Sequence, residues 1–170
     1  EISACLVGSE MCIRDRDATA GFRMMWSNKK HPNCIYLDVR PECEPDVIGD
    51  FRDLSQFPDQ SFKLIVFDPP HRVQRHPSKT FIEKYGCQLL PETWVSDLTK
   101  AFKELWRLLE EYGILIFKWT DHDIKVSAVQ QVFPSDPLFQ QITSGSGRRK
   151  RATRTVWFCF MKIPKNEEEV

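Results

Sequence analysis

The sequence lacks several features that would each point to a function by themselves. No apolar run approaches the roughly 20 residues that a membrane-spanning helix needs. The chain has 24 basic and 24 acidic residues, so its global charge selects no class of partner. What remains is a single globular domain by length, because 170 residues with 41% hydrophobic content suffice for one ordinary core.

The six cysteines form no recognisable framework. They contain no C-x-x-C pair, and no histidine stands at the spacing of a zinc site, which argues against a metal centre. Several of them lie inside apolar stretches, which is typical of free buried thiols in a reducing compartment. We therefore predict a cytoplasmic protein that binds no metal.

The first sixteen residues have no clear hydrophobic periodicity. They do not form a signal peptide, because no compact apolar core precedes a small-residue cleavage site. Residues 5–16 resemble a translated sequencing adapter, and an apolar strand ahead of Asp17 is absent. We predict that residues 1–16 are not native to the domain, that the domain covers residues 17–163, and that residues 164–170 form a polar tail.

One stretch organises the rest of the chain. The apolar run Phe62–Phe67 stops at Asp68 and is followed by Pro69, Pro70 and His71. A continuously apolar run indicates a buried parallel strand, and prolines end it because they have no N–H to donate. Asp68 is therefore predicted at the carboxyl end of a buried strand, where open α/β sheets bind ligands. The structural alternative is a local turn hydrogen bond made by Asp68.

Three earlier segments also end in an acid, namely Asp17, Asp38 and Asp50. Four acids at one edge of a sheet are costly unless they bind a group that is rich in donors. A nucleoside with ribose hydroxyls, an amine and a sulfonium fits that description.

The remaining pattern alternates between helices and strands. Helices are predicted over 91–109 and 123–132, and strands over 114–119, 138–142 and 155–162. Tyr112 and Gly113 are expected to end the first of these helices. This alternation predicts an α/β, Rossmann-like, mostly parallel sheet with helices on both faces and an antiparallel C-terminal strand.

From residue 17 to 162 the chain resembles the class I S-adenosylmethionine-dependent methyltransferases. Within them it is similar to a small phage and bacterial branch related to the DNA enzymes that methylate amines. The resemblance implies S-adenosyl-L-methionine as cofactor, held by Asp17, Ala18, Gly21, Asp38, Asp50 and Phe51. The first motif contains one glycine where many members have two or three.

Asp68-Pro69-Pro70-His71 resembles the catalytic motif of that branch, with His71 at a position that most members fill with Tyr, Phe or Trp. The resemblance implies that Asp68 and the Pro69 carbonyl accept the N–H groups of an exocyclic base amine, of the N6-adenine or N4-cytosine type. The target base must be flipped out or single-stranded, and His71 is expected to stack on it.

Two basic segments are candidates for binding the phosphates of DNA. Residues 71–90 are predicted to form a substrate-facing lid, and residues 144–154 a basic turn; a merely solvated loop is the alternative for each. The candidate contacts are Arg72, Arg75, Lys79, Arg148, Arg149 and Arg151. Two other functions stay open, a methyltransferase for a small molecule or protein and an inactive, N-terminally truncated protein of the same fold.

Overall fold

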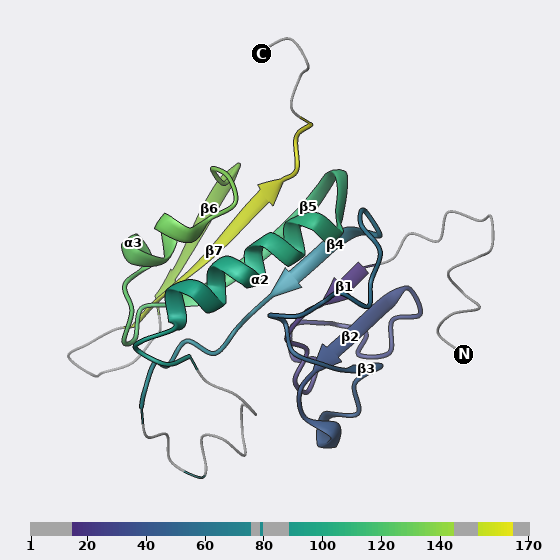
Figure 1. Cartoon of the computed structure of the whole chain (residues 1–170), viewed down its shortest axis with the longest axis horizontal. Helices are drawn as coiled ribbons and strands as arrows, with labels where there is room; N and C mark the ends of the chain where they lie inside the picture. Colours follow the sequence, from purple (N-terminus) through teal and green to yellow (C-terminus); the bar gives the residue numbers. More distant parts are fainter. Residues whose placement is uncertain (1–14, 76–78, 80–88, 145–152, 165–170) are drawn as a thin grey trace.

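The computed structural model describes residues 15–75, 79, 89–144 and 153–164. Within these residues the chain forms a seven-stranded sheet in the order β3-β2-β1-β4-β5-β7-β6 (Figure 1). The strands are β1 (Asp15–Asp17), β2 (Cys34–Asp38), β3 (Val47–Ile48), β4 (Phe62–Phe67), β5 (Leu109–Thr120), β6 (Phe139–Ser144) and β7 (Arg154–Met161). The helical elements are η2 (Pro41–Cys43), α2 (Trp94–Leu108), α3 (Val126–Val129) and η3 (Gln130–Val132).

The sheet has the order of a doubly wound fold with an antiparallel end. β1 pairs in parallel with β2 and β4, β2 with β3, and β4 with β5. β7 is antiparallel to both β5 and β6. The chain runs outward from β1 to β3 and then returns to place β4 on the other side of β1. The winding direction therefore reverses between β1 and β4, and ligands bind such sheets at that crevice.

The predicted fold class is confirmed. The sheet is mostly parallel, and the antiparallel strand near the C-terminus is β7. Helix α2 crosses one face of the sheet in front of β4 and β5 (Figure 1). Phe133, which follows η3, packs against Phe102 of α2 with their ring centroids 5.6 Å apart, so η3 covers the same face. Helices α2 and η3 therefore lie on one face of the sheet.

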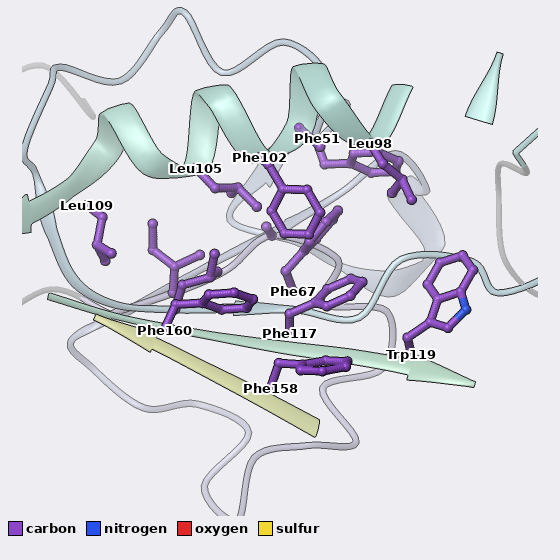
Figure 2. Close-up of a cluster of buried hydrophobic side chains, with 14 of the residues drawn as sticks. Phe51, Phe67, Leu98, Phe102, Leu105, Leu109, Phe117, Trp119, Phe158 and Phe160 are labelled. Carbon is purple, nitrogen blue, oxygen red and sulfur yellow. The ribbon is translucent and has the colours of Figure 1, made fainter. Parts of the chain in front are cut away.

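Aromatic rings fill the layer between α2 and the sheet (Figure 2). Phe102 of α2 lies 5.0 Å from Phe117 of β5 and 5.8 Å from Phe67 of β4, measured between ring centroids. All three side chains are buried, and each contributes roughly 1.5–3 kcal/mol by leaving water. This packing fixes the ends of β4 and β5 side by side, which places the residues that follow Phe67 and Phe117.

The boundary between α2 and β5 differs from the prediction. Gly113 was expected beyond the end of the helix, but it lies inside β5, which begins at Leu109 directly after α2. A Cβ on Gly113 would lie 2.8 Å from Leu109 Cγ, so only glycine fits there. Tyr112 before it has a left-handed φ of 61°. The glycine thus serves a close approach within the strand rather than a helix stop.

The helix predicted over 123–132 is also shorter in the structure. It consists of one α-helical turn, α3, and one 3-10 turn, η3. The carboxylate of Asp121 accepts the N–H of Val126 and so fixes the start of α3. Three valines, at 126, 129 and 132, limit helix propensity in this short segment.

Strand β1 contains a buried charge at the centre of the sheet. Arg16 is fully buried, and its guanidinium carbon lies 3.9 Å from the centroid of the Phe57 ring. Its three guanidinium nitrogens have no hydrogen-bond partner among the described residues. The domain boundary that the sequence placed at residue 17 falls within β1 and stays a prediction.

Candidate active site

A pocket lies at the carboxyl edge of the sheet, at the point where the winding direction reverses. The segment after β1 and the end of β2 form one wall, and the segment after β4 forms the other. Lys118 near the end of β5 and His122 close the far side. The lining residues are Ala18, Thr19, Leu37, Asp38, Val39, Arg40, Gly49, Phe51, Asp68, Pro69, Pro70, His71, Arg72, Lys118 and His122.

Asp68 is placed by strand register and by its own backbone. Phe67 pairs with Phe117, so the next residues, Asp68 and Lys118, are neighbours across the two strands. The ammonium of Lys118 donates to Asp68 Oδ2 at 2.6 Å. The backbone N–H of Asp68 donates to Thr19 Oγ1 at 2.8 Å, which ties this turn to the segment after β1. The turn is therefore held from two strands.

The two oxygens of Asp68 have different surroundings. Oδ2 accepts the bond from Lys118, whereas Oδ1 is buried and receives no well-aligned hydrogen bond from a described residue. His71 Nε2 lies 2.9 Å from Oδ1 but off the line that a hydrogen bond needs. Burial alone would raise the pKa of Asp68. His71 and Lys118 outweigh burial and lower that pKa below its ordinary value.

The ring of His71 already contacts other side chains, so it differs from an aromatic ring that is free to stack on a base. Its ring meets Trp119 edge to face, with centroids 5.3 Å apart and an interplanar angle of 76°. Its Nδ1 is buried and has no partner among the described residues. The ring is thus held by Trp119 and by the Asp68 carboxylate, and its stacking on a base stays a prediction.

Asp38 at the end of β2 is heavily bonded. It accepts the backbone N–H of Gly21 at 2.7 Å, and Gly21 has the left-handed φ of 48° that suits glycine. Arg40 donates from its backbone N–H and its Nε to Oδ1 and from Nη2 to Oδ2. Four N–H groups therefore engage this carboxylate, and its predicted role in holding the cofactor stays a prediction.

Asp17 at the end of β1 lies beneath the pocket rather than in its lining. The side chain is buried, and it accepts Trp26 Nε1 at 2.8 Å and the Thr19 N–H at 3.2 Å. Burial raises the pKa of Asp17 to about 6, although the bonds from Trp26 and Thr19 oppose that rise. The carboxyl therefore shapes the turn that Ala18 and Thr19 present to the pocket.

The third acid, Asp50, is not among the residues that line the pocket. Asp50 accepts both the backbone N–H and the side chain of Arg52, and Arg52 also reaches Asp97. Burial would raise the pKa of Asp50, but the bonds from Arg52 lower it overall. Of the predicted pair only Phe51 lines the pocket, and Asp50 lies outside the lining.

The structure describes three of the six basic residues that were predicted to hold phosphate. Arg72 lines the pocket and pairs with Asp123 at 3.1 Å. Arg75 pairs with Glu92, and Lys79 is exposed. The other three, Arg148, Arg149 and Arg151, lie outside the described residues.

Sequence reasoning missed several lining residues, of which Lys118 matters most. It is the one lysine in the apolar run 114–119, and that run ends beside the run that ends in Asp68. Aligning the ends of the two strands would have pointed to it. Arg40 and His122 carry no comparable signal in the sequence.

Neither a metal centre nor a membrane span is found in the described part of the chain. No group of three or more His, Cys, Asp or Glu side chains there is placed to hold a metal ion. No described helix is both long and apolar enough to cross a membrane. Three of the cysteines, Cys34, Cys43 and Cys159, are buried free thiols, and the cytoplasmic location stays a prediction.

Comparisons with known proteins show the fold. No family model and no curated protein matches the chain. Among solved structures, it is similar to an rRNA methylase from Streptococcus thermophilus, with a TM-score of 0.55 and 11% identity over 89% of this chain and 88% of that one. The N-methyltransferase NodS from Bradyrhizobium japonicum, solved with S-adenosyl-L-homocysteine, gives 0.58 and 13% over 88% and 78%. The chain has the Rossmann-like methyltransferase fold.

The same fold also occurs in an enzyme with a different reaction. The [4+2]-cyclase SpnF gives a TM-score of 0.60 and 11% identity over 90% of this chain and 75% of that one. The fold alone therefore does not determine the reaction, which depends on the residues of the pocket.

Proposed function

We propose that this chain is an S-adenosyl-L-methionine-dependent methyltransferase that acts on an exocyclic base amine of nucleic acid, with DNA as the first candidate. The observation that carries the proposal is the Asp68 carboxylate at the carboxyl edge of β4. It lines the pocket, Lys118 donates to its Oδ2, and His71 Nε2 lies 2.9 Å from its Oδ1. These two neighbours hold the pKa of Asp68 below its ordinary value, so the carboxylate is ionised at neutral pH.

The residues of the pocket fit the proposed cofactor in kind and in place. The crevice lies at the reversal of the sheet, where this class of fold binds nucleotides. Phe51 offers an apolar wall for an adenine ring, and Asp38 offers acceptors for ribose hydroxyls. Because Arg40 and Gly21 engage Asp38, a ribose would have to replace one of the contacts that Arg40 makes. Ala18 and Thr19 line the wall nearest to Asp68.

When bound, the cofactor supplies an electrophilic methyl group on a sulfonium. The protein has to present a nitrogen lone pair to it, and an exocyclic base amine shares that pair with its ring. The Asp68 carboxylate, with the Pro69 carbonyl, would accept the N–H groups in place of its contact with His71 or Lys118 and turn the lone pair toward the methyl group. Positioning of this kind supplies most of the acceleration. The same carboxylate would take the proton that the nitrogen loses, a step that contributes roughly 10²–10⁴-fold.

The experiment that tests this proposal is transfer of a radiolabelled methyl group to DNA, RNA and free nucleosides, with Asp68→Ala as the variant. The variant should lose at least a hundredfold in rate while its calorimetric affinity for S-adenosyl-L-homocysteine stays within threefold. Asp136→Ala is the matched control, because it removes an exposed carboxylate outside the pocket lining. Transfer by Asp68→Ala at the rate of the parent chain would show that the acceptor role is wrong.

A further inference from the structure

Asp38 and Arg40 form a closed ion pair inside the pocket, and the proposed function leaves this pair unexplained. Both side chains line the pocket, and each is less than a tenth exposed. The Arg40 guanidinium donates from Nε to Asp38 Oδ1 at 2.9 Å and from Nη2 to Oδ2 at 3.2 Å. Bidentate pairs of this kind are strong, so Arg40 occupies both oxygens that a ligand of Asp38 would need.

Two main-chain groups orient the Asp38 carboxylate independently of the Arg40 side chain. The backbone N–H of Gly21 donates to Oδ2 at 2.7 Å, and the backbone N–H of Arg40 donates to Oδ1 at 3.0 Å. Both bonds remain when the side chain at position 40 is changed. The main chain therefore holds the carboxylate, whereas the guanidinium neutralises it and covers its oxygens.

Ribose hydroxyls require the same acceptors as the guanidinium. In doubly wound folds an acid at the end of the second strand hydrogen-bonds the ribose of a nucleotide, and Asp38 ends β2. Each oxygen of Asp38 accepts one main-chain N–H and one N–H of the guanidinium. A ribose would exchange its O–H donors for those of the guanidinium, so the net gain in free energy is small.

The same arrangement occurs a second time, outside the pocket. Arg52 donates from its backbone N–H and its Nε to Asp50 Oδ1, and from Nη2 to Oδ2. Neither of these two residues lines the pocket. The chain therefore contains two matched Asp-x-Arg clamps, namely Asp38 with Arg40 and Asp50 with Arg52, and only the first is placed to meet a ligand of the pocket.

We propose that Arg40 is an affinity-setting residue, which competes with the ribose of the cofactor for the Asp38 carboxylate and so weakens nucleoside binding. This inference rests on the proposed function, because it takes the pocket to hold a nucleoside. The displaced guanidinium has a neighbouring contact in the exposed ring of Phe22, whose centroid lies 5.8 Å from the guanidinium carbon. Removal of this arginine should therefore tighten binding, whereas removal of an arginine that holds the ligand would weaken it.

The test measures adenosine affinity by calorimetry in the parent chain, in Arg40→Met and in Arg52→Met, the matched control from the second clamp. Arg40→Met should bind adenosine at least about tenfold more tightly, because hydrogen bonds to a charged acceptor form without loss of the guanidinium bonds. Arg52→Met should bind adenosine no more tightly than the parent chain. An affinity of Arg40→Met equal to or below that of the parent chain would overturn the proposal.

A second ligand shows whether the gain arises at Asp38. 2′,3′-Dideoxyadenosine lacks both hydroxyls, so its affinity should agree within about threefold between Arg40→Met and the parent chain. An equal gain for both ligands would overturn the proposal, because it would place the effect away from the ribose hydroxyls.

Arg40→Lys keeps the proposal testable if thermal unfolding shows that Arg40→Met is not folded. It retains a positive charge beside Asp38, but an ammonium lacks the planar fork that spans both oxygens. This variant should bind adenosine more tightly than the parent chain, and a lower affinity would contradict the competition. A gain in adenosine affinity in a chain that transfers no methyl group would retain the competition and remove the proposed function. Absence of binding in all these proteins would remove both.

Discussion

Two charged side chains near the centre of the sheet have opposite surroundings. Arg16 on β1 is buried between apolar rings and has no hydrogen-bond partner among the described residues. Asp68 after β4 is mostly buried as well, but it has Lys118 and His71 beside its carboxylate. Burial lowers the pKa of Arg16 to about 9, whereas its two neighbours hold the pKa of Asp68 below the ordinary value. The difference shows that neighbouring groups, more than burial itself, decide whether the pKa moves toward or against the charged form.

The comparison predicts opposite effects when each charge is disturbed. A buried charge without a partner costs stability, so its removal should stabilise the fold. When a paired charge loses its partner, the fold loses stability, because the remaining group keeps its desolvation cost. The following variants test both halves, from the largest expected effect to the smallest.

Arg16→Met should raise the free energy of unfolding by about 2–4 kcal/mol, because it replaces an uncompensated charge with an apolar chain of similar length. Urea unfolding measures this change. Lys100→Met, at an exposed site on α2, is the control and should shift stability by less than about 0.5 kcal/mol. A loss of stability in Arg16→Met would show that the guanidinium is compensated in solution.

Asp17→Asn should remove part of the pH dependence of stability. Burial raises the pKa of Asp17 to about 6 in the folded chain, above its ordinary value. Its contribution to stability is therefore fully present below about pH 4 and is lost as pH rises through about 6. The parent chain should lose about 2–3 kcal/mol more than the variant between pH 4 and pH 7.

Urea unfolding at several pH values gives this difference directly. Asparagine still offers an oxygen to Trp26 Nε1, so the variant keeps the local hydrogen bond that the carboxylate makes. Parallel curves for the two proteins would mean that Asp17 is ionised without cost in the folded state.

Lys118→Met should lower the free energy of unfolding by about 1–3 kcal/mol, because it leaves the Asp68 carboxylate without its ammonium partner. Thermal unfolding at neutral pH measures the effect. The double variant Lys118→Met, Asp68→Asn should recover most of the loss, since the carboxylate charge is then gone. If the single variant is as stable as the parent chain, the pair contributes nothing to the fold.

Gly21→Ala should cost about 1 kcal/mol, because Gly21 has a left-handed φ of 48° and a Cβ there would lie 3.2 Å from Arg40 Nη2. It should also weaken S-adenosyl-L-homocysteine binding severalfold by disturbing the bond from the Gly21 N–H to Asp38. Calorimetry reports both the stability and the affinity. Unaltered affinity would place the cofactor away from this turn.

The parts of the site that the sequence predicted are those whose signal is local. Asp68 and its two prolines follow an apolar run, so strand, stop and acid can be read from ten consecutive residues. The ends of β1 and β2 were placed for the same reason. The fold class followed from the alternation of such segments.

The parts that the sequence did not predict depend on how distant segments meet. Lys118 reaches Asp68 because β4 and β5 pair in a particular register, which neither strand encodes alone. Asp50 lies outside the lining and is bonded to Arg52, two residues later. Gly113 was predicted to end the helix, but it lies within β5, where its missing Cβ leaves room for the side chain of Leu109.

The most direct test of the central claim is the position of the transferred methyl group. The chain is incubated with labelled S-adenosyl-L-methionine and DNA or RNA, and the nucleosides are then separated by mass spectrometry. The account predicts label on the exocyclic nitrogen of adenine or cytosine, and its loss in Asp68→Ala. Label on a ribose oxygen or a ring carbon, or no transfer to any nucleoside, would contradict the account.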